Sequence, residues 1–201
     1  MSIRQILLSV LLLQAGIHFG CASTQAPRYY LLSPVSISPD VKWEPCITIG
    51  VHTVRVPRYL ERPQIMIRSS ANELTISEFD LWAEPVEENI SRVIARNLET
   101  LLCADVREIR PGQRRQDVDY RLNIEVTRMD GDFGEKAVLE ALWSVTGGAD
   151  SSELFVGKSR YTGDAGRTHA SLVSAQSGLL AELSREMADV FTSLSQRLPK
   201  G

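Results

Sequence analysis

The thiol of Cys21 is the side chain whose sequence setting most directly indicates chemistry. It follows a short leader in which one charged residue, Arg4, precedes the largely apolar stretch 6–13, and Gly20 stands immediately before the cysteine. A basic start, an apolar run and a small residue are typical of an export signal. A cysteine at the cleavage point can receive a diacylglycerol group. We therefore predict a signal peptide of residues 1–20 and lipidation of Cys21.

The leader also allows two other interpretations. A retained spanning helix would need about 20 mostly apolar residues, whereas this run is shorter and is interrupted by Gln14 and His18. A soluble protein cleaved nearby is the second alternative, because His18 and Phe19 differ from the usual residues before a lipidated cysteine. Acyl chains would anchor the protein firmly, since each buried methylene contributes about 0.8 kcal/mol. In that case residues 21–27 would form a tether.

The other two thiols, Cys46 and Cys103, could form a disulfide in an oxidising compartment. A bridge that closes so long a loop would add roughly a few kcal/mol of stability. The alternative for Cys103 is a small buried thiol, because it ends an amphipathic helix. Spacing in the sequence cannot place two cysteines within bonding distance, so both interpretations stay open.

No group of side chains in the mature sequence predicts an active site. His52 and His169 lack metal-ligand spacing with cysteine or carboxylate groups. Residues 157–159 (Gly-Lys-Ser) end like a phosphate-binding loop, but Ser152 stands where that loop needs a glycine, and strand residues follow where it needs a helix. We therefore expect no catalytic residue, no metal and no cofactor apart from the covalent lipid.

The charge balance bears on the choice of partner. The chain has 22 basic and 25 acidic side chains, and the leader contains only Arg4 among them, so the mature chain is mildly acidic. Such a domain has no general attraction to nucleic acid. We therefore expect no nucleic-acid partner.

Two amphipathic helices dominate the hydrophobic pattern. The first begins near Pro85, a suitable first helical residue, with acidic residues 87–88 in its opening turn and an apolar stripe as far as Leu102. The second runs from about 170 to 198, with apolar residues on one side, and Pro199 ends it.

Shorter segments have the pattern of strands separated by turns. Residues 130–134 predict a turn. Because the first helix could serve as a crossover, we predict an α/β fold, a mixed β-sheet with helices packed on it, with α+β as the alternative. Residues 28–199 would form one periplasmic domain. The predicted strands are 28–32, 47–57, 64–69, 73–77, 105–109, 120–126, 137–145 and 154–161.

Several segments, in this order along the chain, resemble one protein family. They are 29–32 (Tyr-Tyr-Leu-Leu), 54–65 (with Pro-Arg-Tyr-Leu), 78–85 (ending Trp-Ala-Glu-Pro), 130–134 and 139–143. In these segments the chain is similar to auxiliary lipoproteins of ABC-type transport systems, of the paraquat-inducible protein C type. The resemblance implies a three-layer αβα fold, comparable to an anticodon-binding domain. It also implies a non-catalytic role beside an MCE-domain tunnel protein (PqiB-like) that carries lipid between the inner and outer membranes.

Location and other partners follow from the same resemblance. In bacterial lipoproteins, a residue other than aspartate after the lipidated cysteine permits export to the outer membrane, and here that residue is Ala22. This implies a lipid-anchored protein on the periplasmic face of the outer membrane. A homo-oligomer is a further expected assembly. The alternatives are a subunit of another envelope-biogenesis complex, and an exported enzyme or solute-binding protein.

The candidate partner-binding residues are Arg55, Arg58, Tyr59, Leu60 and Trp82. They lie in the segments that carry the resemblance, and protein interfaces favour aromatic side chains and arginine. For Trp82, a place in the hydrophobic core is an equal alternative. The basic stretch 110–115 is expected to be a solvated loop, with a contact to an acidic partner or to lipid headgroups as the alternative.

Overall fold

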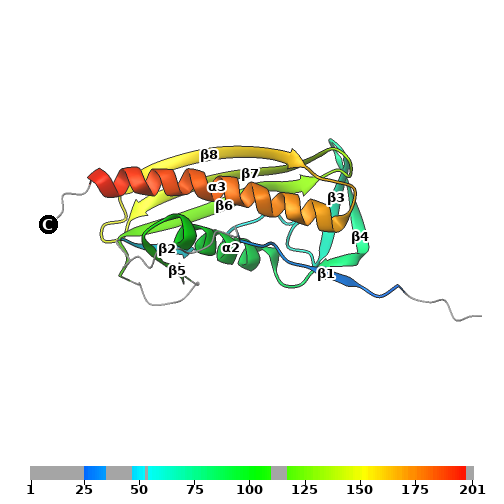
Figure 1. Ribbon diagram of the computed structural model, residues 1–201, viewed down its shortest axis with the longest axis horizontal. Coiled ribbons are helices and arrows are strands. Elements are labelled where there is room, and N and C mark those ends of the chain that lie inside the picture. Colours follow the sequence, from blue (N-terminus) through cyan, green and yellow to red (C-terminus); the bar gives the residue numbers. More distant parts are fainter. Residues whose placement is uncertain (1–24, 35–46, 53, 110–116, 198–201) are drawn as a thin grey trace, which may run out of the picture.

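The computed structural model describes residues 25–34, 47–52, 54–109 and 117–197 (Figure 1). Two sheets and two helices make up this part of the chain. The elements in chain order are β1 (Arg28–Tyr30), β2 (Ile47–His52), β3 (Gln64–Ser70), β4 (Glu73–Trp82), α2 (Val86–Leu101), β5 (Ala104–Ile109), β6 (Tyr120–Gly131), β7 (Lys136–Gly147), β8 (Glu153–Asp164) and α3 (His169–Arg197).

The larger sheet has five strands in the order β5-β2-β6-β7-β8. β2 runs parallel to both β5 and β6, and β6, β7 and β8 form an antiparallel meander. The meander forms because its strands alternate: Leu122, Ile124 and Val126 are buried, whereas Asn123 between them is exposed. The mixed sheet with packed helices is confirmed, and the segregated helices and meander correspond to the α+β alternative.

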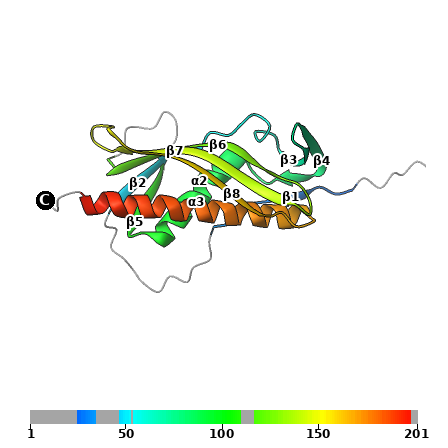
Figure 2. The same cartoon turned by 90° about the horizontal axis from the view of Figure 1, so that it is seen from above.

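Both helices lie against one face of this sheet and against each other (Figures 1 and 2). Leu180, Leu183, Met187 and Phe191 of α3 are fully buried at helical spacing. The described part of the chain therefore has two layers, where three were expected, because no described helix covers the other face of the sheet. Since polar and charged side chains such as Asn123, Glu140 and Arg160 line that face between its few apolar residues, it can remain exposed to water.

Side-chain hydrogen bonds hold α3 in place. Glu186 on α3 accepts from the hydroxyls of Ser159 and Tyr161 on β8, both at 2.6 Å. Trp143 on β7 donates its indole N–H to Ser159 Oγ at 3.0 Å. Burial is the main reason that the pKa of Tyr161 is raised. These contacts give the buried polar groups of Trp143, Ser159 and Glu186 hydrogen-bond partners between the sheet and the helix.

The smaller sheet has the order β1-β4-β3 and lies at one end of the molecule (Figure 1). β1 pairs in parallel with the end of β4, with Arg28 opposite Asp80 and Tyr30 opposite Trp82. β1 is therefore the first described element that the chain forms after the predicted tether, and it belongs to the smaller sheet.

Several element boundaries predicted from the sequence differ from those in the structure. β2 ends at His52 and does not continue to residue 57; beyond it, Arg55 makes only an isolated parallel bridge with Glu125. The predicted turn at 130–134 is wrong for Asp130 and Gly131, which end β6. β4 continues to residue 82 because its second half pairs with β1.

The N-terminal end of α2 differs from the prediction. Pro85 is the N-cap residue and not the first helical residue, with an extended backbone at ψ 124°. No side chain caps this end, but Glu87 and Glu88 place negative charge in the first turn.

Among the described helices, none is both long enough and apolar enough to cross a membrane.

Candidate functional site

The five predicted contact residues do not form one surface. Leu60 and Trp82 are buried in the core, at 4% and 5% exposure. This contradicts a partner contact for Leu60 and supports the core alternative for Trp82. Leu60 closes a tight turn through its N–H bond to the Pro57 carbonyl, which turns its side chain inward. Trp82 lies on the buried side of β4, in register with Tyr30.

Tyr59 is half-buried and works as a structural link. Its hydroxyl donates to Asp130 Oδ2 at 3.2 Å and accepts the N–H of Met129 at 3.1 Å. Burial, partly opposed by the Met129 bond, raises the pKa of Tyr59 to about 12. The phenol therefore stays protonated and fastens the turn at residues 57–60 to β6.

Arg55 and Arg58 are the predicted contact residues that are exposed. The guanidinium of Arg55 lies 2.9 Å from Glu125 on β6. Its backbone is held by two bonds: its N–H donates to the Ile124 carbonyl at 3.1 Å, and its carbonyl accepts from Val126 N–H at 2.9 Å. Arg55 thus presents its charge from a fixed backbone position.

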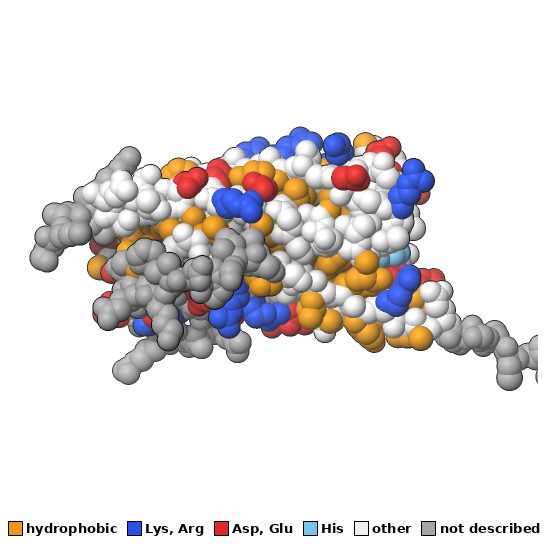
Figure 3. Space-filling view, in the orientation of Figure 1, with side chains coloured by type: hydrophobic (Ala, Val, Ile, Leu, Met, Phe, Trp, Pro, Cys, Tyr) orange, Lys and Arg blue, Asp and Glu red, His pale blue; other side chains and the backbone are white. Residues whose placement is uncertain are grey.

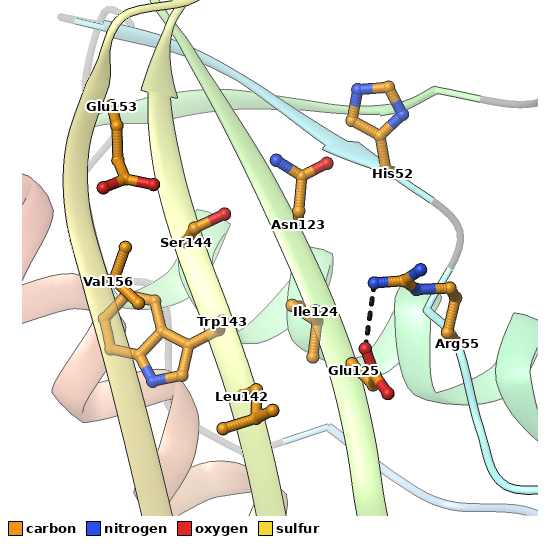
Figure 4. Close-up of a pocket in the computed structure, with 10 residues that line it drawn as sticks. All are labelled: His52, Arg55, Asn123, Ile124, Glu125, Leu142, Trp143, Ser144, Glu153 and Val156. Atoms are coloured by element: carbon orange, nitrogen blue, oxygen red, sulfur yellow. Dashed lines mark hydrogen bonds and ion pairs between the residues drawn. The ribbon is translucent and has the colours of Figure 1, made fainter.

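Arg55 stands at the rim of a hollow of about 620 Å³ on the helix-free face of the larger sheet. Figure 4 shows Asn123, Leu142 and Ser144 projecting from neighbouring strands, with the Arg55–Glu125 pair at one side. Val156, which is 61% exposed and pairs in register with Ser144, is a second exposed apolar side chain of the hollow in addition to Leu142. We call this surface the Arg55 hollow.

The chemistry of the Arg55 hollow suits binding through a small apolar centre with a polar rim. His52 lies at its edge, and burial together with the nearby Arg121 lowers the pKa of that imidazole. A neutral imidazole, an amide and a hydroxyl offer hydrogen bonds, but they are not arranged as a nucleophile with its base. In the described part of the chain, no cluster of His, Cys, Asp or Glu could hold a metal ion.

A second cluster fastens β1 to the folded domain. Asp80, which is 4% exposed, accepts from Arg28 at 2.9 Å, from the Tyr30 hydroxyl at 2.7 Å and from Ser77 at 2.9 Å. Nδ1 of His169, the first residue of α3, lies 3.3 Å from the same carboxylate. We call these five residues the Asp80 cluster.

Electrostatics explain why the Asp80 cluster is stable at neutral pH. Burial alone would raise the pKa of Asp80, but hydrogen bonds from Tyr30, Arg28 and Ser77 outweigh it and hold that pKa below its ordinary value. Burial lowers the pKa of His169, and Asp80 offsets this only in part. The imidazole is therefore neutral, and it packs edge-on against Phe133 at 4.9 Å between ring centres.

We expect mild acid to weaken the attachment of β1 and α3. Because the folded pKa of His169 is lowered, its contribution is complete above the unfolded value of about 6.5 and is lost as the pH falls, by at most about 1.4 kcal/mol per pH unit. Asp80 adds a loss in the same direction only below about pH 4. Urea unfolding across this range should give a shallower pH slope for His169→Gln. The pKa of His52 is lowered too, so His52→Gln should also flatten the slope, but in that variant acid should still increase hydrogen exchange in β1 and at the start of α3. If acid increases hydrogen exchange in β1 as much in His169→Gln as in wild type, the assignment is wrong.

Comparison with known proteins assigns the chain to a family. Residues 29–188 match the family described as "ABC-type transport auxiliary lipoprotein component". The match begins in β1 and ends within α3, so it includes the Arg55 hollow and every residue of the Asp80 cluster except Arg28. The chain belongs to this family. It is accordingly an auxiliary lipoprotein of a transport system.

Named relatives of this lipoprotein support the assignment. The protein "Intermembrane transport lipoprotein PqiC" from Escherichia coli K12, and its counterpart from Shigella flexneri, are each 27% identical to it over 126 residues. These residues make up 62% of this chain and 66% of the relative. The match thus covers slightly less than two thirds of the relatives' own length.

Solved structures share the fold of the lipoprotein. A crystal structure of an uncharacterized protein has a TM-score of 0.68 and 18% identity, covering 83% of this chain and 99% of that one. A Xanthomonas campestris protein of the DUF330 family has a TM-score of 0.62 and 20% identity, covering 86% and 96%. At these identities the likeness concerns the fold alone.

The cysteines are only partly described. Cys21 and Cys46 lie outside the described residues, whereas Cys103 is disulfide-bonded. The N–H of Ile47, next to Cys46 in sequence, donates to the Cys103 carbonyl at 3.3 Å, so the described chain around both positions is close together. The pairing of Cys46 with Cys103 stays a prediction.

Sequence reasoning missed both buried carboxylates, Asp80 and Asp130. A signal for Asp80 was present: in β4 it alternates with Phe79 and Leu81 and shares its face with Trp82, which places a charge on the buried side. A buried charge requires partners. The partners Arg28 and His169 are distant in sequence, so the pattern within β4 could not name them.

Proposed function

We propose that this auxiliary lipoprotein is held on the periplasmic face of the outer membrane by acyl chains on Cys21. There it would serve as a non-catalytic docking subunit for an MCE-domain tunnel protein (PqiB-like) in a system that moves lipid between the two membranes. The observation that carries this proposal is the family match over residues 29–188, which begins at β1, directly after the predicted tether. The name of the relative, "Intermembrane transport lipoprotein PqiC", supports a role in transport between membranes.

The surface of the domain is compatible with docking. The Arg55 hollow combines a fixed arginine, two exposed apolar side chains and short polar groups on an open sheet face. Arg58 adds a second exposed cation on the segment that follows Arg55. A site of this kind would bind an acidic and apolar surface of a partner, and acyl anchoring would raise the local concentration of both proteins.

Loss of the thiol at position 21 should abolish membrane attachment. Wild type and Cys21→Ser are expressed with labelled palmitate, and the inner and outer membranes are then separated. We expect label and protein together in the outer-membrane fraction for wild type, and unlabelled, released protein for the variant, because one residue carries the acyl chains. Cys103→Ser is the control thiol variant and should keep its label. Unlabelled, soluble wild type would contradict the anchor.

Docking is tested by crosslinked pull-down of the MCE-domain protein from the same bacterium. Arg55→Glu and Arg58→Glu should reduce its recovery severalfold and leave the melting temperature nearly unchanged, since both side chains are exposed. Arg185→Glu, an exposed arginine on α3 paired only with Glu182, is the matched control. Tyr59 is unsuitable for this test because its hydroxyl is bonded to Asp130. Recovery of a different envelope complex would instead support the alternative role.

A further inference from the structure

An apolar patch lies on the smaller sheet, where the tether joins the domain. Tyr29 and Leu31 are 63% and 49% exposed, which is unusual for large hydrophobic residues. Tyr29 pairs in register with Leu81 of β4, and Phe79 lies on the same side of that strand. Phe79 and Leu81 are partly exposed and lie outside the hydrophobic core. Figure 3 shows hydrophobic side chains gathered at the end of the molecule from which the N-terminal chain leaves. We call Tyr29, Leu31, Phe79 and Leu81 the apolar patch.

The apolar patch exists because the two sides of β4 face different surroundings. Asp80 and Trp82 point inward, to the Asp80 cluster and the core. Their neighbours Phe79 and Leu81 must then point outward, since successive side chains of a strand face opposite sides. A strand whose outer side is in contact only with water usually carries polar residues on that side. Contact with an apolar medium would remove this exposed surface from water.

The length of chain before the patch limits what that medium can be. Fully extended, the chain from Cys21 to Gln25 spans at most about 14 Å, and the chain from Cys21 to Tyr29 at most about 28 Å. An acyl group on Cys21 would therefore keep this end of the domain within reach of the bilayer surface.

The tether also joins a rigid part of the protein. Beyond the Asp80 cluster, Leu32 N–H donates to Asn89 Oδ1 on α2 at 2.7 Å, and Ser33 N–H donates to Ser177 Oγ on α3 at 3.1 Å. These bonds fix β1 to both helices. The anchor would consequently orient the whole domain and not a loose end of chain.

We propose that the apolar patch rests in the interface of the phospholipid bilayer that holds the anchor, which fixes the orientation of the domain on the membrane. The inference rests on the lipidation of Cys21 in the proposed function. Tyrosine suits the boundary between headgroups and hydrocarbon, because its ring is apolar and its hydroxyl is polar. Arg28, 57% exposed beside the patch, would lie level with the phosphate groups. The Arg55 hollow is on a different sheet and stays free for a protein partner.

The test compares adjacent residues on opposite sides of one strand. The acylated protein carries an environment-sensitive fluorophore on Phe79→Cys or, as the matched control, on Glu78→Cys, and it is bound to vesicles of phosphatidylethanolamine and phosphatidylglycerol. We expect a blue shift and a severalfold rise in emission for the label at 79, with quenching by brominated lipid, and little change for the label at 78. A label on Val156→Cys, which lies on β8 and is more exposed than Phe79, should not respond. Unaltered melting temperatures show that the labelled proteins are folded.

Three results would decide between the proposals. A response at 79 alone supports the patch as a membrane contact. Protein that floats with the vesicles but gives no response at 79 would overturn the inference and leave the anchor intact. Mass spectrometry showing unmodified Cys21, with protein that does not float, would overturn the anchor on which the inference rests.

Discussion

Replacing Asp130 with alanine should lower the free energy of unfolding by about 3 kcal/mol. The carboxylate is fully buried and pairs with Arg68 on β3 at 2.7 Å and with Arg128 at 2.9 Å. Burial would raise the pKa of Asp130, but the two arginines outweigh it and keep the pKa below its ordinary value. Without the carboxylate, both guanidinium groups remain in a largely dehydrated site. Each is 20–30% exposed, so water relieves part of the cost, and we expect the lower end of the usual range.

Urea unfolding measures this loss, and Asp132→Ala is the matched control. Asp132 lies two residues away in the turn after β6, is partly exposed and should change stability by less than about 0.5 kcal/mol. Hydrogen exchange should increase mainly in β3 for Asp130→Ala, since Arg68 connects the smaller sheet to β6 through this carboxylate. Equal stability of the two variants would show that water already solvates the arginines.

Reduction of the Cys103 disulfide should destabilise the domain by about 4 kcal/mol if it closes the loop from Cys46. A crosslink over a loop of about 58 residues removes much conformational freedom from the unfolded chain. It would also bind the start of β2 to the start of β5, two neighbouring parallel strands paired from Ile47 and Ala104 onward. The measurement is urea unfolding with and without dithiothreitol, in a Cys21→Ser background so that no third thiol can exchange.

Cys103→Ser is the control for reduction and should unfold identically with and without reductant. Peptide mapping without reductant should recover residues 46 and 103 in one crosslinked fragment. If Cys46 were recovered as a free thiol, the predicted pairing would be wrong. A stability change much below 2 kcal/mol would mean that the unfolded chain is compact without the bridge.

The two buried carboxylates have a common structural purpose. Asp80 joins β1 to β4 and α3, whereas Asp130 joins β3 to β6. Both therefore attach the smaller sheet, which receives the tether, to the body that carries the Arg55 hollow. A buried and well-bonded charge is sensitive to the position of every partner, so these contacts specify one geometry. A subunit anchored at one end and docked at another would need this rigidity.

The amino-acid sequence by itself determined the elements with strong local patterns. The apolar stripe from Val86 onward predicted α2, and Pro199 and the long stripe before it predicted α3 within a residue or two. Alternation predicted the meander, because each strand has one face on the core. The order of family-specific segments predicted the family, which the match over residues 29–188 confirms.

Only the tertiary structure decided which predicted contact residues are surface residues. Tyr59, Leu60 and Trp82 look like interface residues because aromatic and apolar side chains are favoured both in interfaces and in cores. Whether such a side chain is buried depends on elements far away in sequence: β1 covers one edge of β4, and Asp130 on β6 binds Tyr59. The same holds for the bare sheet face and the Asp80 cluster. Local residue patterns determine strands and helices, whereas burial and ion pairing arise from long-range packing.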